Sequence, residues 1–133
     1  MEAASSCRPS EKPTVLVIEN EPIIRMETVQ MLHGAGYAVR DVSNTDDAMT
    51  LLEDHDGIRA VFTEIRVPGR LDGMNLARAI AGRWPGIRLV VTSSVPKTAS
   101  FPDDWRYVPK PYDGAQIAAT LCSLLTPRLK LVG

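Results

Sequence analysis

Short apolar runs alternate along the chain with segments that have the period of a helix. The first run, Thr14–Ile18 (TVLVI), is continuous and rich in β-branched residues, as a strand covered on both faces requires. Pro22 then stands at a plausible first helical position. The side chains that follow recur on one helix face. They are Ile24, Thr28, Met31, Leu32 and Ala35.

The same alternation continues to the end of the chain. Asn44 and Asp113 are each suited to cap a following helix, and a further helix is expected from about Asp72. Pro85 and Pro127 end two of these helices, because proline cannot continue a helical hydrogen-bond ladder. The other predicted strands are Tyr37–Val42, Ile58–Thr63, Ile87–Thr92 and Tyr107–Val108.

Strands that alternate with helices over short loops predict an α/β fold. Parallel strands need crossover connections, and right-handed crossovers place helices on both faces of the sheet. The 133 residues are enough for one domain, which we expect over residues 13–126. Residues 1–12 are expected to be a disordered N-terminal segment, and residues 127–133 a C-terminal tail.

One stretch departs from the regular alternation. The segment between Thr92 and Tyr107 (SSVPKTASFPDDWR) holds Pro96 and Pro102 and lacks a helical period. Each proline removes a backbone donor and disfavours helix in the residue before it. We therefore expect the fourth helix to be short or irregular.

Composition narrows the possible functions. A formal net charge of -1 and the lack of a basic run argue against nucleic-acid binding, and no apolar segment approaches the length of a membrane span. Cys7 and Cys122 have no metal-ligand spacing, so we expect free thiols in a reducing, cytoplasmic environment.

Polar side chains stand at the carboxyl ends of the predicted strands. In an open parallel sheet these ends meet at one edge, where ligands bind. The sequence therefore predicts that acidic groups, hydroxyls and a lysine converge from four separate segments. These residues are Glu19, Asn20 and Glu21 after the first strand, Glu64 at the third, Thr92 and Ser93 at the fourth, and Lys110 after the fifth.

Four blocks of sequence resemble a known family. The runs VLVIENEP, VFTEIRVPGRLDGM, VVTSS and YVPKPY are similar to the signature blocks of response-regulator receiver domains, in the same order and spacing. The resemblance spans about residues 13–126. It implies a flavodoxin-like, doubly wound sheet of five parallel strands in the order 2-1-3-4-5.

The resemblance also implies roles for residues around the acidic pocket. Glu19 and Asn20 fall where the family has an acidic pair that holds magnesium. Glu64 falls on the aspartate that receives a phosphoryl group from a histidine kinase. Arg66 would offer that metal only its backbone carbonyl.

Four more positions match the family's switch region. Thr92 corresponds to the hydroxyl that senses the phosphoryl group, and Tyr107 to an aromatic switch. Lys110 corresponds to the lysine that contacts the acceptor, and the bond before Pro111 resembles one that is cis in the family.

Two departures from the family pattern affect the chemistry. The extra methylene of Glu64 moves its carboxylate by roughly 1.5 Å, and a shift of that order costs a positioned reaction on the order of 100-fold. Asn20 takes one charge from a site for a hard cation. We therefore expect no cofactor, or at most weak magnesium held by Glu19, Glu64 and the Arg66 carbonyl.

These departures lead to a functional hypothesis. We expect a pseudo-receiver that is not an enzyme and that acts by contact with a histidine kinase or another signalling protein. Glu64 would reach toward Thr92 and Lys110 and approximate the charge of a phosphoryl group. Two alternatives stay open: a static scaffold, and a receiver with residual, magnesium-dependent phosphorylation. Only PRLKLVG follows the last predicted helix, so no output domain is expected.

Overall fold

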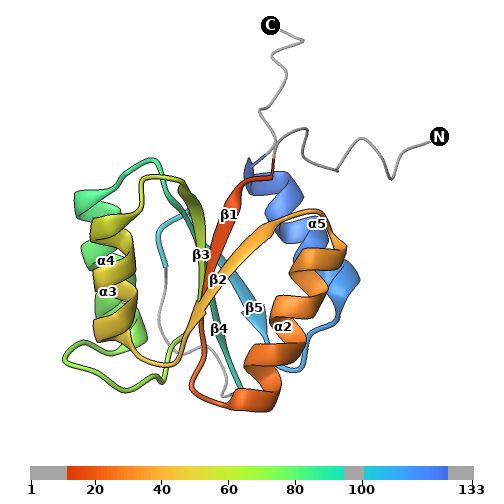
Figure 1. The fold of residues 1–133 in the computed structure, drawn as a ribbon, viewed down its shortest axis with the longest axis horizontal. Coiled ribbons are helices and arrows are strands. Elements are labelled where there is room, and N and C mark those ends of the chain that lie inside the picture. Colours follow the sequence, from red (N-terminus) through yellow and green to blue (C-terminus); the bar gives the residue numbers. More distant parts are fainter. Residues whose placement is uncertain (1–11, 95–100, 126–133) are drawn as a thin grey trace, which may run out of the picture.

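The computed structural model describes residues 12–94 and 101–125, which form one sheet flanked by helices. Every strand pair is parallel, and the order is β2-β1-β3-β4-β5 (Figure 1). The expected sheet type and order are therefore confirmed. The strands are β1 (Thr14–Ile18), β2 (Ala38–Val42), β3 (Ile58–Glu64), β4 (Arg88–Ser93) and β5 (Arg106–Pro109).

Helices cover both faces of this sheet. Figure 1 shows α3 and α4 together on one face, and α2 and α5 on the other. This arrangement follows from the parallel connections, each of which crosses over a face of the sheet. The described helices are α2 (Pro22–Gly34), α3 (Thr45–Asp54), α4 (Gly73–Arg83) and α5 (Gly114–Leu125).

Side chains on the two faces of the sheet pack into two separate hydrophobic cores. Leu16 and Ile18 of β1 pack with the α3 and α4 side chains, whereas Val15 and Val17 pack with those of α2 and α5. Successive side chains of a strand point to opposite faces, so a doubly covered strand must be apolar throughout. Val15–Ile18, Val61–Phe62 and Leu89–Val91 are accordingly buried.

Side-chain caps start three of the helices; Asn44 and Asp113 were predicted as caps, and Asp72 stands where a helix was expected to begin. The Asn44 side chain accepts a hydrogen bond from the Asp47 amide at 2.7 Å, at the beginning of α3. Asp72 and Asp113 do the same for α4 and α5, each at 2.8 Å. Each cap satisfies an amide that has no partner within its own helix.

The irregular stretch before β5 is described only in part. Residues 95–100 lie outside the described residues, as do 1–11 and 126–133, where the disordered N-terminal segment and the C-terminal tail are expected. Among the described residues of this stretch, Ser94 and 101–105 are not helical. Phe101 stacks on Trp105 and on Tyr107, with ring centroids 6.0 Å and 5.8 Å apart.

No helix in the described part of the chain is both long enough and apolar enough to span a membrane.

Candidate functional site

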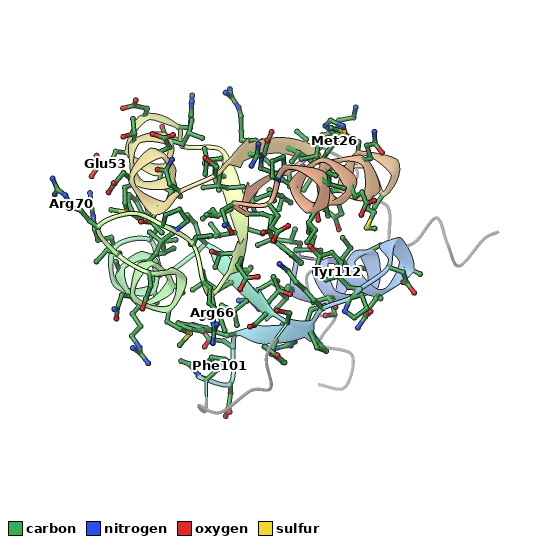
Figure 2. All side chains as sticks on the ribbon, turned by 90° about the horizontal axis from the view of Figure 1, so that it is seen from below. Met26, Glu53, Arg66, Arg70, Phe101 and Tyr112 are labelled. Carbon is green, nitrogen blue, oxygen red and sulfur yellow. The ribbon has the colours of Figure 1, made fainter. Side chains whose placement is uncertain are left out.

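The sheet topology brings the predicted polar residues to one edge. Glu19 directly follows β1, Glu64 is the last residue of β3, and Lys110 directly follows β5. Glu64 and Thr92 are partners in the register of β3 and β4. Figure 2 looks toward this edge, with Tyr112 beside α5 and Arg66 between α4 and β5.

A largely buried lysine side chain lies between the two carboxylates. Lys110 Nζ lies 2.5 Å from Glu64 Oε1 and 2.7 Å from Glu19 Oε1, and the second contact is an ion pair without regular hydrogen-bond geometry. The side chains of Lys110, Glu64 and Glu19 are 12%, 7% and 3% exposed. We call these three residues the ion triad. At this depth each charge depends on its partners, because desolvated charges are costly when unpaired.

A backbone amide donates a hydrogen bond to the second oxygen of each carboxylate. The Arg66 amide donates to Glu64 Oε2 at 3.0 Å, and the Glu21 amide donates to Glu19 Oε2 at 3.1 Å. Each carboxylate therefore accepts from an amide two residues further along the chain, which orients its other oxygen toward Lys110. All four carboxylate oxygens of the ion triad have a donor or a cation beside them.

The ion triad alters the proton affinity of its lysine. Burial lowers the pKa of Lys110, but the charge-assisted contacts with Glu19 and Glu64 outweigh burial and raise this pKa above its ordinary value of 10.5. The ammonium is thus fully protonated at neutral pH. The two carboxylates compensate a charge that would otherwise be unfavourable in the interior.

A glycine allows α4 to approach the end of β3. The Gly73 amide donates to the Ile65 carbonyl at 2.9 Å, and a Cβ on Gly73 would lie 2.1 Å from the Glu64 carbonyl oxygen. The Ile65 amide in turn donates to the Thr92 carbonyl at 2.9 Å. Glu64 is therefore held between β4 and the first turn of α4.

Tyr112 fixes the loop that carries Lys110, a role that sequence reasoning missed. Its hydroxyl lies 2.7 Å from Thr28 Oγ1 on α2, and its ring meets Phe62 edge-on at 5.3 Å. Burial raises the pKa of Tyr112 above its ordinary value of 10.0. Lys110 donates its amide to the Ser93 carbonyl at 3.0 Å, and the Lys110–Pro111 bond is cis, as the resemblance implied.

Two predicted switch residues lie outside the ion triad. The Thr92 hydroxyl is buried and has no hydrogen-bond partner within the described residues. The expected contact between Glu64 and Thr92 is therefore wrong, because the Glu64 carboxylate is bound by Lys110 and the Arg66 amide instead. Tyr107 packs on Phe101, in the core that faces α3 and α4.

Comparison with known proteins agrees with this architecture. Residues 15–121 match the sequence model of a protein family described as the response regulator receiver domain. The chain belongs to the receiver domain family. Receiver domains are signalling modules of two-component systems, so the chain is a two-component signalling domain.

Several relatives and solved structures resemble this receiver domain. A response regulator receiver protein from Sinorhizobium medicae is 27% identical, covers 91% of this chain and 100% of its own, and superposes with a TM-score of 0.80. The receiver domain of the hybrid histidine kinase CckA shares the fold, with 21% identity, a TM-score of 0.72, and coverage of 85% of this chain and 99% of its own.

The curated relatives are much longer than this chain. The sensor kinase CckA of Brucella abortus is 29% identical over 122 residues, which cover 87% of this chain and 13% of the kinase. The sensor protein TorS of Escherichia coli is 29% identical over 76 residues, which cover 57% of this chain and 8% of that protein.

The magnesium that the family implies does not fit the ion triad as it stands. A hard divalent cation needs free carboxylate or carbonyl oxygens, and here Lys110 Nζ lies between the two carboxylates. Asn20 is exposed and makes no side-chain hydrogen bond within the described residues. In the same part of the chain, no three His, Cys, Asp or Glu side chains are grouped as a metal site.

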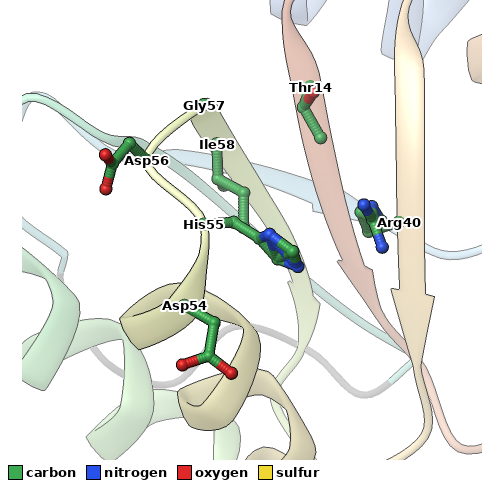
Figure 3. A pocket seen from close by; sticks show the side chains of 7 residues that line it. All are labelled: Thr14, Arg40, Asp54, His55, Asp56, Gly57 and Ile58. Carbon is green, nitrogen blue, oxygen red and sulfur yellow. The ribbon is translucent and has the colours of Figure 1, made fainter.

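A hollow lies at the amino ends of the strands, away from the ion triad. Its volume is 310 Å³, and Figure 3 shows the His55 ring pointing toward Arg40 across it. Asp54 and Asp56 also line this hollow, so charges of both signs are present and neither sign is selected. None of the predicted site residues reaches it.

Proposed function

We propose that this receiver domain signals through protein–protein contact and does not accept a phosphoryl group at Glu64. The observation that carries the proposal is the closed bonding of Glu64, whose two oxygens are held by Lys110 Nζ and the Arg66 amide. In this account Glu64 replaces the family's aspartate and supplies the negative charge that a phosphoryl group would bring.

The chemistry of phosphoryl transfer supports this proposal. A carboxylate nucleophile must present a free oxygen in line with the donor, and metal ions neutralise the charge that develops. Attack by Glu64 would require it to leave two donors, in a pocket where its side chain is 7% exposed. Lys110 and the Arg66 amide, which could bind a transferred phosphoryl group, are already engaged.

The proposed partner is a histidine kinase or another protein of the same signalling system. The two curated relatives are themselves named as a sensor kinase and a sensor protein. The first turns of α2 expose two large apolar side chains, Ile23 at 70% and Met26 at 59%. Figure 2 shows Met26 on the outer side of α2, where a partner can reach it.

The static scaffold is the second candidate, and the closed ion triad favours it. One observation argues for a switch instead. A buried hydroxyl without a partner costs about 1–3 kcal/mol, and Thr92 is in that condition next to Glu64 in register. An arrangement in which Thr92 gains a partner would recover this energy, and this favours a switch over a rigid scaffold.

Exposure to a small phosphodonor tests the proposal. The native chain, Glu64→Asp and Glu64→Gln are incubated with acetyl phosphate and magnesium, and their intact masses are measured. We expect the native chain to keep its mass. If it gains the mass of one phosphoryl group and Glu64→Gln does not, the domain is a residually active phosphoacceptor and the proposal is wrong. Glu64→Asp is the matched control, because it restores the family's acceptor at unchanged charge.

A further inference from the structure

We propose that Thr45 is a positioning residue for the acidic pocket, and that the loop of residues 65–72 couples the first turn of α3 to the Glu64 carboxylate. The inference deepens the proposed function and rests on it for one premise, that the bonding of Glu64 sets the state of the domain. It gives α3 a part in that state, although no residue of α3 belongs to the ion triad.

Thr45, the first residue of α3, binds this loop with both its amide and its hydroxyl. The amide donates to the Pro68 carbonyl at 2.9 Å, and Oγ1 donates to the Leu71 carbonyl at 2.7 Å. Thr45 is 1% exposed, so water cannot replace either donor unless the loop moves away from α3. Figure 1 shows the loop between β3 and α4 passing close to the start of α3.

The loop lies so close to α3 that one of its positions requires glycine. Gly69 has a φ of +134°, which favours glycine, and a Cβ on it would lie 2.0 Å from Thr45 Oγ1. The Arg70 amide donates to Asp46 Oδ1 at 3.4 Å, on the same turn of α3. Residues 68–71 therefore all contact the first turn of α3, and the path of the loop follows the position of that turn.

The same loop carries the amide that orients the Glu64 carboxylate. The Arg66 amide donates to Glu64 Oε2 at 3.0 Å. The next residue, Val67, is 6% exposed and packs in the core that faces α3 and α4. Where the loop ends, the Gly73 amide donates to the Ile65 carbonyl at 2.9 Å. Because the loop is short and is anchored on both sides of Arg66, its displacement from α3 moves the amide that Glu64 accepts from.

A contact that only stabilises the domain and a contact that positions Glu64 predict different results. Loss of a purely stabilising contact lowers the free energy of unfolding and leaves the folded acidic pocket unchanged. Loss of a positioning contact weakens the hydrogen bond between the Arg66 amide and Glu64 within the folded state. The Arg66 amide proton and the Glu64 carboxyl carbon report on this hydrogen bond directly, so their NMR resonances separate the two roles.

NMR spectra of the native chain, Thr45→Val and Thr45→Ser test the inference. Thr45→Val keeps the shape of the side chain and removes its hydroxyl, whereas Thr45→Ser keeps the hydroxyl and is the matched control. We expect Thr45→Val to move the Arg66 amide proton upfield and to shift the Glu64 carboxyl carbon, and Thr45→Ser to keep both near their native positions. Ile117→Val lies in the core on the other face of the sheet, controls for a general loss of stability, and should move neither resonance.

A double-mutant cycle provides a second readout. Urea denaturation is measured for Thr45→Val, for Glu64→Gln and for the double variant. The two losses should be non-additive by at least about twofold in the unfolding equilibrium constant, because each substitution alone already weakens the contact of the Arg66 amide. Gly69→Ala disturbs the same contact from the side of the loop, and it replaces Thr45→Val if circular dichroism shows that the latter is unfolded.

Two results would overturn the inference. One is a folded Thr45→Val or Gly69→Ala chain whose Arg66 amide and Glu64 carboxyl resonances keep their native positions. The other is additive losses in the cycle, which would show that Thr45 only stabilises the domain. Neither result bears on phosphorylation, because the mass measurement with acetyl phosphate decides that question separately. A native chain that gains a phosphoryl group would instead contradict the proposed function.

Discussion

Glu64 differs from aspartate by one methylene group, and at this length both oxygens of its carboxylate have partners. The carboxylate contacts Lys110 Nζ with one oxygen and the amide of a residue two positions away with the other. The backbone of Lys110 is itself held, because its amide donates to the Ser93 carbonyl. The ion triad is therefore a closed set of charges.

The members of the ion triad should differ in what they contribute to stability. Lys110→Met leaves two buried carboxylates without their cation, so it should lower the free energy of unfolding by about 3–5 kcal/mol. Glu64→Gln keeps a neutral acceptor and leaves the ammonium paired with Glu19, so it should cost only about 1–3 kcal/mol. Urea denaturation of both variants measures the two losses. Equal losses, or a larger one for Glu64→Gln, would contradict the assignment of Lys110 as the central charge.

The raised pKa of Lys110 predicts a loss of stability at high pH. A group that binds its proton more tightly when folded contributes stability below its unfolded pKa, which is ordinarily 10.5 for lysine, and loses it as pH rises through the folded pKa. The stability difference between the native chain and Lys110→Met should therefore be constant from neutral pH to about pH 10 and shrink above it.

The raised pKa of Tyr112 acts in the same direction, so the comparison is best made in a Tyr112→Phe background. Urea midpoints at several pH values provide the measurement. A difference that persists undiminished well above the ordinary pKa of lysine would mean that the ion triad does not hold the Lys110 proton.

At the scale of residues, the sequence predicted one contact of Glu64 correctly and another wrongly. The approach of Glu64 to Lys110 could be expected, because both residues stand at the carboxyl ends of strands in one parallel sheet. The failure of Glu64 to meet Thr92 could not, since it depends on the Arg66 amide, and a backbone amide leaves no signature in a sequence. The functional roles of these side chains stay predictions.

At the scale of elements, the ends of the helices position the site. Asn44 and Asp113 were recognisable as caps because capping is a local rule of side-chain type and spacing. The link between Tyr112 and Thr28 was not recognisable, because these residues are 84 positions apart and meet only after α2 and α5 pack on the same face.

Gly73 should be the most sensitive glycine near the site. Gly73→Ala places a methyl group 2.1 Å from the Glu64 carbonyl oxygen, so α4 must move away from β3. Overpacking of this kind costs about 1–3 kcal/mol. Gly82→Ala is a matched control in the same helix, where nothing lies within 4 Å of the new group.

Gly82→Ala should stabilise the domain by about 0.5–1 kcal/mol, because alanine is the better helix former. Thermal unfolding of both alanine variants measures the contrast. If Gly73→Ala proved as stable as Gly82→Ala, the close approach of α4 to the end of β3 would be refuted.

The hydroxyl pair of Tyr112 and Thr28 should couple α2 to the loop of Lys110. Tyr112→Phe removes the hydroxyl and keeps the ring against Phe62, so it should cost about 0.5–1.5 kcal/mol. In a double-mutant cycle with Thr28→Val, the two losses should be non-additive by at least about 0.5 kcal/mol, since the hydroxyls contact each other. Additive losses in denaturant unfolding would show that this hydrogen bond contributes nothing.

At the scale of the whole molecule, the fold followed from the alternation of apolar runs and helical segments. A (βα) repeat with short connections allows a parallel sheet covered on both faces, and the observed β2-β1-β3-β4-β5 order is the one that the resemblance implied. The connection between β4 and β5 is the part that local patterns predicted least, because prolines disfavour a regular helix without defining another structure. Its described portion contains a turn at residues 103–104, and Phe101 stacks on Trp105 and on Tyr107.

The central claim is that Glu64 permanently fills the position that a phosphoryl group would occupy, and that the domain does not respond to phosphodonors. Its most direct test is the backbone amide NMR spectrum of the native chain, recorded with and without a beryllium fluoride phosphoryl analogue and magnesium. We predict unchanged resonances for Thr92, Tyr107 and Lys110, because the donors that would bind the analogue are engaged by Glu64. Saturable shifts of these resonances in the native chain would contradict the account.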